Sequence, residues 1–154
     1  MRVSVIGGSS VGEQHYDLAR DVGRLLGKRG HEVVCGGLGG VMEGVCRGAI
    51  ETGGHTIGVL PGEDRAAANE YVETAVATGL GNARNALVVL NSDGAIAIDG
   101  STGTLSEIAL ALDRGLAVAG LDTYDIEGVE AVETPEKAIE HVEREAGHRY
   151  ESER

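Results

Sequence analysis

Short apolar segments and helix-like segments alternate along this chain, and glycine-rich turns separate them. Residues 3–6 and Glu32–Cys35 are apolar on both faces, whereas residues 13–29 carry Leu and Val at the spacing of a helix. Strands that are apolar on both faces are typical of a parallel sheet whose connections are helices. The alternation therefore predicts an α/β fold, a Rossmann-like three-layer sandwich with a mainly parallel sheet.

The remaining segments continue this alternation. We expect further strands at residues 56–60, 71–75, 95–98, 116–119 and 129–132. We expect further helices at residues 41–51, 80–91, 104–114 and from Thr134, with a polar loop at 63–70. The 154 residues are enough for one domain, placed at residues 1–146 and followed by a frayed charged tail at 147–154.

The chain is acidic, with a formal net charge of -12 from 25 acidic and 13 basic side chains. Nucleic-acid binding depends on basic side chains that neutralise phosphates, so this balance argues against a nucleic-acid partner. Only Lys28 and Lys137 are lysines. We expect such a balance in a salt-adapted, halophilic protein, and an acidic protein without this adaptation is the alternative.

Several other classes are excluded by the residues present. Residues 2–6 run straight into a glycine turn without a signal peptide, and no apolar run is long enough to span a membrane, so we expect a cytoplasmic protein. Cys35 and Cys46 lack a CxxC spacing and are expected to be reduced and buried. The five histidines show no zinc-type spacing, so no protein-bound metal is expected.

Pyridoxal phosphate chemistry requires a lysine near the ligand site. Lys28 and Lys137 both fall in expected helices away from the carboxyl edge of the sheet. We therefore expect no required cofactor of this kind.

The most informative motif is DGSTGTLSE at residues 99–107, a glycine- and hydroxyl-rich turn between an apolar strand and a helix. Unpaired N–H groups at a helix N-terminus favour an anion, and phosphate is the expected ligand of residues 100–104. Glu107 follows one helical turn later. Its alternative role is a capping box, with Thr104 as the cap.

Two more glycine-rich turns, residues 7–12 and 36–40, follow expected strands. Ligands of parallel sheets bind at the carboxyl ends of strands, near the point where strand order reverses, so the three turns are expected to line one pocket. Residues 7–12 do not fit a dinucleotide fingerprint, because Ser9 replaces its second glycine, or a P-loop, because Glu13 replaces its lysine. Tight turns without a ligand are the alternative for these glycines.

These motifs together resemble the Lonely Guy and molybdenum-cofactor-carrier superfamily, often mislabelled lysine decarboxylase. The resemblance rests on GGxxGVM at 36–42, IGVLP at 57–61, the Ala-Arg-Asn sequence at 83–85, and residues 99–107 followed by IALAL. Lonely Guy phosphoribohydrolases carry the signature PGGxGTxxE and an upstream arginine. Gly103, Thr104 and Glu107 match this signature, and Arg84 stands at the family's separation from it.

The chain also departs from the Lonely Guy signature. Asp99 replaces the proline, Ser101 replaces a glycine, and Asn85 replaces the lysine that follows the arginine. The short length and the SEIALAL continuation are more similar to the carrier branch, for which the resemblance implies binding of a phosphorylated pterin. The resemblance also implies a homo-oligomer. Backbone N–H groups and the hydroxyls of the 100–104 turn still supply donors for a phosphate.

The leading hypothesis is a protein that binds a phosphorylated small molecule, either an AMP-like nucleoside monophosphate or a molybdenum cofactor. Arg84 would pair with an anionic group of the ligand; a solvated helix residue is its alternative role. The candidate ligand-binding residues are Gly8, Ser9, Gly39, Gly40, Met42, Arg84, Asn85, Gly100, Ser101, Thr102, Gly103, Thr104 and Glu107.

The second hypothesis is a phosphoribohydrolase that splits the N-glycosidic bond of a nucleoside 5′-monophosphate. Glu107 would stabilise positive charge on the ribosyl carbon, and Arg84 would orient the substrate. A nucleic-acid module related to the DNA-processing members of the superfamily is disfavoured by the charge.

Overall fold

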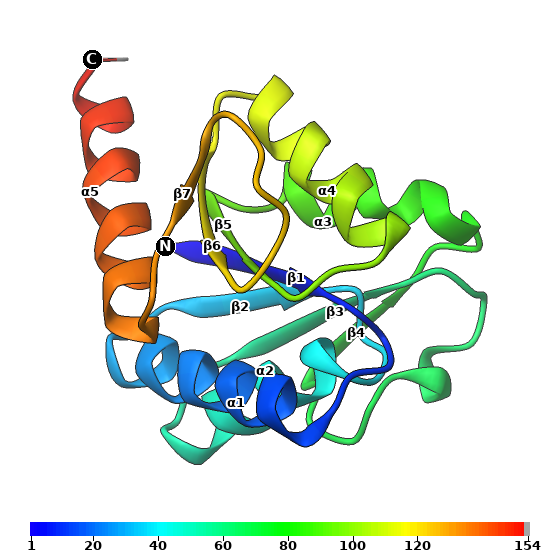
Figure 1. The fold of residues 1–154 in the computed structure, drawn as a ribbon. Coiled ribbons are helices and arrows are strands. Elements are labelled where there is room, and N and C mark those ends of the chain that lie inside the picture. The colour runs from blue at the N-terminus through cyan, green and yellow to red at the C-terminus, as the bar shows by residue number, and fades with distance from the viewer. Residues whose placement is uncertain (153–154) are drawn as a thin grey trace.

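The computed structural model describes residues 1–152, which form a seven-stranded parallel sheet with helices on both faces (Figure 1). The strands are β1 Arg2–Gly7, β2 Glu32–Cys35, β3 Thr56–Leu60, β4 Thr74–Ala77, β5 Gly94–Ile98, β6 Ala117–Leu121 and β7 Val129–Ala131. Their order is β4-β3-β2-β1-β5-β6-β7, so the direction of the connections reverses between β1 and β5. The predicted Rossmann-like sandwich is confirmed.

The helices divide between the two faces of the sheet. They are α1 Glu13–Lys28, α2 Val41–Glu51, α3 Asn85–Leu90, α4 Thr102–Asp113 and α5 Pro135–Ser152, with short 3-10 segments η1 Arg65–Ala67 and η2 Gly81–Arg84. One core cluster joins α1, α2 and α5 to the sheet, and smaller clusters join α3 and α4 to its other face. The α1 and α2 helices lie close together because a glycine of α2 packs directly against the backbone of α1. A Cβ at Gly48 would lie 1.9 Å from the Arg20 carbonyl oxygen.

The central segments β2, α2 and β3 have the predicted bounds, whereas three other predictions were wrong in detail. The helix expected at 80–91 divides into η2 and α3. The strand expected at 71–75 starts only at Thr74, because the Thr56 hydroxyl bonds to the Tyr71 carbonyl and the Glu73 N–H in place of ladder bonds. The expected frayed tail is helical as far as Ser152, and residues 153–154 lie outside the described part of the chain.

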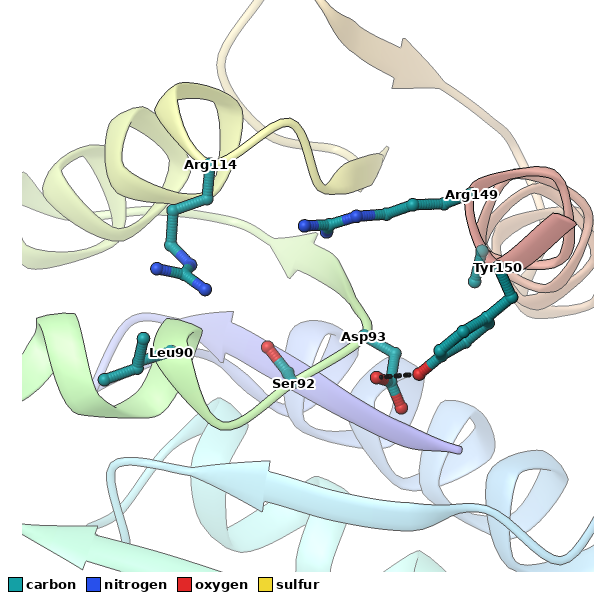
Figure 2. A pocket seen from close by; sticks show the side chains of 7 residues that line it. Leu90, Ser92, Asp93, Arg114, Arg149 and Tyr150 are labelled. Carbon is teal, nitrogen blue, oxygen red and sulfur yellow. Dashed lines mark hydrogen bonds between the residues drawn. The ribbon is translucent and has the colours of Figure 1, made fainter. Parts of the chain in front are cut away.

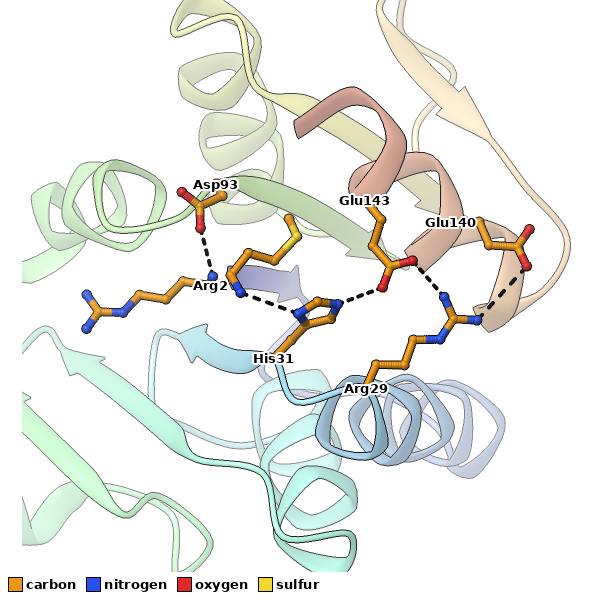
Figure 3. Close-up of polar contacts among 7 residues, drawn as sticks. Arg2, Arg29, His31, Asp93, Glu140 and Glu143 are labelled. Carbon is orange, nitrogen blue, oxygen red and sulfur yellow. Dashed lines mark hydrogen bonds and ion pairs between the residues drawn. The ribbon is translucent and has the colours of Figure 1, made fainter. Parts of the chain in front are cut away.

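The α5 helix is fixed to the amino edge of the sheet by a chain of polar contacts (Figure 3). The Glu143 carboxylate lies 2.7 Å from Nε2 of His31 and 2.8 Å from the Arg29 guanidinium. Next to them, the Arg2 backbone N–H donates to Asp93 at 2.8 Å, and Asp93 also accepts from the Tyr150 hydroxyl. These contacts hold α5 against β2 and β5 and leave the carboxyl edge open.

Two further sequence expectations concern membranes and thiols. No helix within residues 1–152 is long and apolar enough to cross a bilayer. Cys35 and Cys46 are both buried, as predicted, with their sulfur atoms 3.5 Å apart.

Candidate functional site

A cavity of about 240 Å³ opens at the carboxyl edge of the sheet, where strand order reverses. Its lining residues come from all three glycine-rich turns and from the η2–α3 junction. They are Gly7, Ser9, Leu38, Met42, Asn82, Arg84, Asn85, Ser101, Thr102, Gly103, Thr104 and Glu107. The structure thus brings together turns that are about 30 to 90 residues apart in sequence, at the place where doubly wound folds bind ligands.

Four of the sequence-predicted residues lie outside this lining: Gly8, Gly39, Gly40 and Gly100. The structure explains two of them through close packing. Gly40 has a φ of 63°, and a Cβ there would lie 2.2 Å from the Gly8 carbonyl oxygen, which accepts the Val41 N–H. A Cβ at Gly100 would lie 2.6 Å from the Tyr124 ring. Gly40 and Gly100 therefore permit close packing of neighbouring segments, and neither of them lines the cavity.

The α4 helix begins two residues earlier than predicted. Ser101 is its N-cap and forms a capping box with Thr104, whose hydroxyl accepts the Ser101 N–H at 3.2 Å. The Ser101 side chain accepts the Thr104 N–H in this capping box. The N–H groups of Thr102 and Gly103 have no acceptor within the helix, so these two are available at the cavity. The predicted capping box of Thr104 and Glu107 is wrong, because Glu107 lies a full turn inside the helix.

Arg84 is buried, so its alternative role as a solvated helix residue is wrong. Its Nε donates to the Val59 carbonyl at 2.9 Å, one terminal nitrogen donates to the Gly36 carbonyl at 3.5 Å, and the other donates to the Asn85 side chain. A guanidinium has five N–H donors. Arg84 therefore braces the ends of β2 and β3, and two of its five donors make no hydrogen bond within residues 1–152.

Asn85 connects Arg84 to the 100–104 turn. Its side-chain oxygen accepts from Arg84, and its amide donates to the Ser106 hydroxyl at 3.2 Å. That hydroxyl donates in turn to the Gly103 carbonyl at 2.7 Å. A continuous series of hydrogen bonds thus runs from the β3 end to the start of α4.

Glu107 is the only carboxylate among the residues that line the cavity, and it is 8% exposed. Burial raises its pKa to about 7, and the positive charge of Arg84 offsets this only in part. Within residues 1–152, no hydrogen bond or ion pair engages its carboxyl group. A carboxyl group with such a raised pKa in a cavity is typical of a functional site.

Sequence reasoning missed three lining residues: Gly7, Leu38 and Asn82. Gly7 and Leu38 belong to the turns already singled out. Asn82 was hidden inside the expected helix at 80–91. Gly81, with a φ of 59°, begins the 3-10 segment η2 that contains Asn82.

A second polar cavity, of about 220 Å³, lies at the opposite edge of the sheet (Figure 2). Arg114 and Arg149 extend toward it, and Tyr150 donates to Asp93 beside it. The α3 and α4 helices both end here, and the negative ends of their dipoles favour nearby cations. The helix dipoles therefore give Arg114 and Arg149 a structural role at this cavity. No group of three or more His, Cys, Asp and Glu side chains in residues 1–152 is arranged to hold a metal ion.

Known proteins of similar sequence and structure share this architecture. An uncharacterized protein of Archaeoglobus fulgidus is 41% identical over 142 residues, which cover 92% of this chain and 93% of that protein. The molybdenum cofactor binding protein from Rippkaea orientalis is 34% identical, with a TM-score of 0.87 over 93% of this chain and 95% of that one. The Moco carrier protein from Chlamydomonas reinhardtii is 31% identical, with a TM-score of 0.85 over 96% and 98%.

A family model matches residues 1–148, nearly the whole chain. Together with the identity to the Archaeoglobus protein, this match shows the family. The chain belongs to the SLOG cluster4 family.

Proposed function

We propose that this chain binds a phosphorylated small molecule, either a nucleoside monophosphate or a molybdopterin-like cofactor, with the phosphate on residues 100–104. The observation that carries this proposal is the N-terminus of α4, which opens into the cavity beside the hydroxyls of Ser101, Thr102 and Thr104. Names of the Rippkaea and Chlamydomonas relatives support a cofactor-like ligand.

The cavity limits how the ligand would sit. Its volume of about 240 Å³ is below the roughly 300 Å³ of pockets that enclose a drug-sized ligand. A phosphate and an adjoining sugar or ring edge would fit inside, and the rest of the ligand would extend over the rim. The two remaining donors of Arg84 would contact an oxygen of the enclosed part.

The protein would recognise a molybdopterin-like ligand through contacts with its phosphate and its ring. The lining supplies hydroxyls, amides and backbone N–H groups, which suit oxyanions and ring heteroatoms.

Calorimetric titration with AMP, GMP, ribose 5-phosphate and a pterin phosphate tests this proposal. We expect at least one of them to bind, and Ser101→Ala with Thr104→Val to weaken that binding. Ser92→Ala, at the opposite cavity, is the matched control and should bind normally. Silence across the whole panel would reject the proposal. A single-stranded oligonucleotide should not bind, because of the net charge of -12.

Hydrolysis of a nucleoside 5′-monophosphate is the second candidate, and Glu107 favours it. A buried carboxyl group with a pKa of about 7 beside the phosphate site can stabilise a cationic ribosyl centre or transfer a proton. Incubation with AMP followed by chromatography for adenine distinguishes hydrolysis from binding. Glu107→Gln should abolish release of the base while binding of the monophosphate persists.

We further propose that the chain forms a homo-oligomer through the face around β4 and α3. Val76, Leu80 and Leu90 are exposed there, next to an apolar groove that includes Ile57 and Leu87. Residues 74–91 contain no acidic side chain, which reduces the repulsion between two acidic copies at this face. Light scattering should show an oligomer for the wild type and a smaller species for Leu90→Glu.

A further inference from the structure

Glu107 and the proposed phosphate position share one cavity. The helix N-terminus that would hold the anion belongs to α4, and Glu107 lies on that same helix with its side chain lining the same cavity. Two negative charges repel strongly when protein surrounds them and water is scarce. An ionised Glu107 therefore opposes the anion that the helix start attracts.

The surroundings of Glu107 offer little compensation for that repulsion. The α3, β5 and β6 elements packed around α4 contain no ionisable side chain, and Arg2, the only one on β1, lies at the opposite edge of the sheet. Arg84 is the one cation that interacts with Glu107 within residues 1–152, and its charge offsets the effect of burial only in part. The other titratable group that interacts with Glu107 is the Cys35 thiol at the end of β2, which carries no positive charge.

We propose that binding of an anion at the 100–104 turn is coupled to uptake of one proton by Glu107. This inference rests on the proposed function of the same site. The proton comes from solvent and converts the carboxylate to a carboxylic acid, which removes the repulsion and creates an O–H donor facing the ligand. The site therefore selects an anion that carries a hydrogen-bond acceptor, such as a hydroxyl or carbonyl oxygen, next to its charged group.

Sulfate is a suitable probe, because it stays a dianion throughout the neutral range whereas phosphate itself titrates. The protein is titrated calorimetrically with sulfate near pH 6 and near pH 8, in imidazole and in Bis-Tris, two cationic buffers that differ in ionisation enthalpy. For the wild type we expect uptake of about one proton near pH 8 and about tenfold weaker binding than near pH 6, because the Glu107 pKa is about 7.

Glu107→Gln keeps the shape and removes the titration, so its affinity should not change with pH. Asp99→Asn is the matched control: it removes a charge beside the turn, tolerates the φ of 53°, and should keep the wild-type pH dependence. Carbon NMR of the Glu107 carboxyl in the wild type gives an independent reading, with its pKa rising when sulfate is added. That measurement also decides the matter if the Gln variant fails to fold.

The outcomes separate this inference from the proposed function. Sulfate binding with no proton uptake and no pH dependence would overturn the coupling and leave the anion site in place. An absence of binding at both pH values, for the wild type and for Glu107→Gln, would overturn both the coupling and the anion site.

Discussion

The side-chain amide of Asn85 donates to the Ser106 hydroxyl at 3.2 Å, and this contact joins the two halves of the sheet across the candidate site. Asn85 receives a hydrogen bond from Arg84, which is anchored to the ends of β2 and β3. Ser106 holds the carbonyl of Gly103 within the first turn of α4. The shape of the proposed phosphate site thus depends on residues about 20 positions upstream.

Breaking this connection should weaken ligand binding. Asn85→Ala and Ser106→Ala each remove the Asn85–Ser106 hydrogen bond and one neighbouring bond of the series. Each is expected to reduce affinity for a bound monophosphate at least about fivefold, the effect of losing one hydrogen bond of ~1 kcal/mol. The double variant should lose little more than either single one, because both act on one series of contacts. Asn91→Ala, which follows the same helix, removes an exposed hydrogen bond from the Asn91 side-chain amide to the Leu87 carbonyl and serves as the control. Additive losses in the titrations would show that the two residues act separately.

Glu107 should reduce stability at neutral and alkaline pH. Its folded-state pKa of about 7 lies above the ordinary value of 4.5, so the folded protein binds more protons than the unfolded chain between those values. Stability therefore falls as pH rises through this window and then levels off. Urea unfolding of Glu107→Gln near pH 8 should show a gain of about 2 to 3 kcal/mol over the wild type, with little difference near pH 4. An equal effect at both pH values would contradict the raised pKa.

Gly40 and Gly53 allow two reasons for a glycine to be tested separately. One is a backbone with positive φ, and the other is a lack of space for a Cβ. Both have positive φ, but a Cβ at Gly40 would clash with the Gly8 carbonyl, whereas one at Gly53 would meet open space. Gly53→Ala should cost only the left-handed conformation, about 1 kcal/mol. Gly40→Ala should cost roughly 3 kcal/mol or more and also disturb ligand binding. Thermal unfolding checks this, and equal losses in Tm would show that the close approach of the two turns is unimportant.

Salt should stabilise the folded protein. The net charge of -12 makes the compact state repel itself, and added ions screen that repulsion. Thermal unfolding in KCl from low to molar concentration should show a rising Tm. A flat or falling Tm would argue against a salt-adapted protein.

The regular part of the fold was predictable because its signals are local. Strand β2, helix α2 and strand β3 end at turns that contain glycine or proline, and their predicted bounds hold. The α4 start was not resolved by sequence, because both Ser101 and Thr104 fit a cap with a polar partner three residues later. Only tertiary packing, which buries Thr104, Glu107 and Ile108 on one face, decides between them.

The site was predictable as a meeting of turns but not in its internal contacts. The topology places the ends of β1 and β5 together, so the grouping of the turns follows from the fold. Arg84 donates hydrogen bonds to the carbonyls of Gly36 and Val59, which are distant in sequence, and no local pattern predicts these contacts. The same holds for the burial of Glu107, which its helical position alone does not reveal.

An NMR titration of isotope-labelled protein with a phosphorylated ligand from the panel tests the central proposal most directly. We expect the largest amide shifts at Thr102, Gly103 and Thr104, with little change at Ser92 and Arg114 in the opposite cavity. Shifts concentrated at Ser92 and Arg114, or none at the start of α4 under saturating ligand, would contradict it.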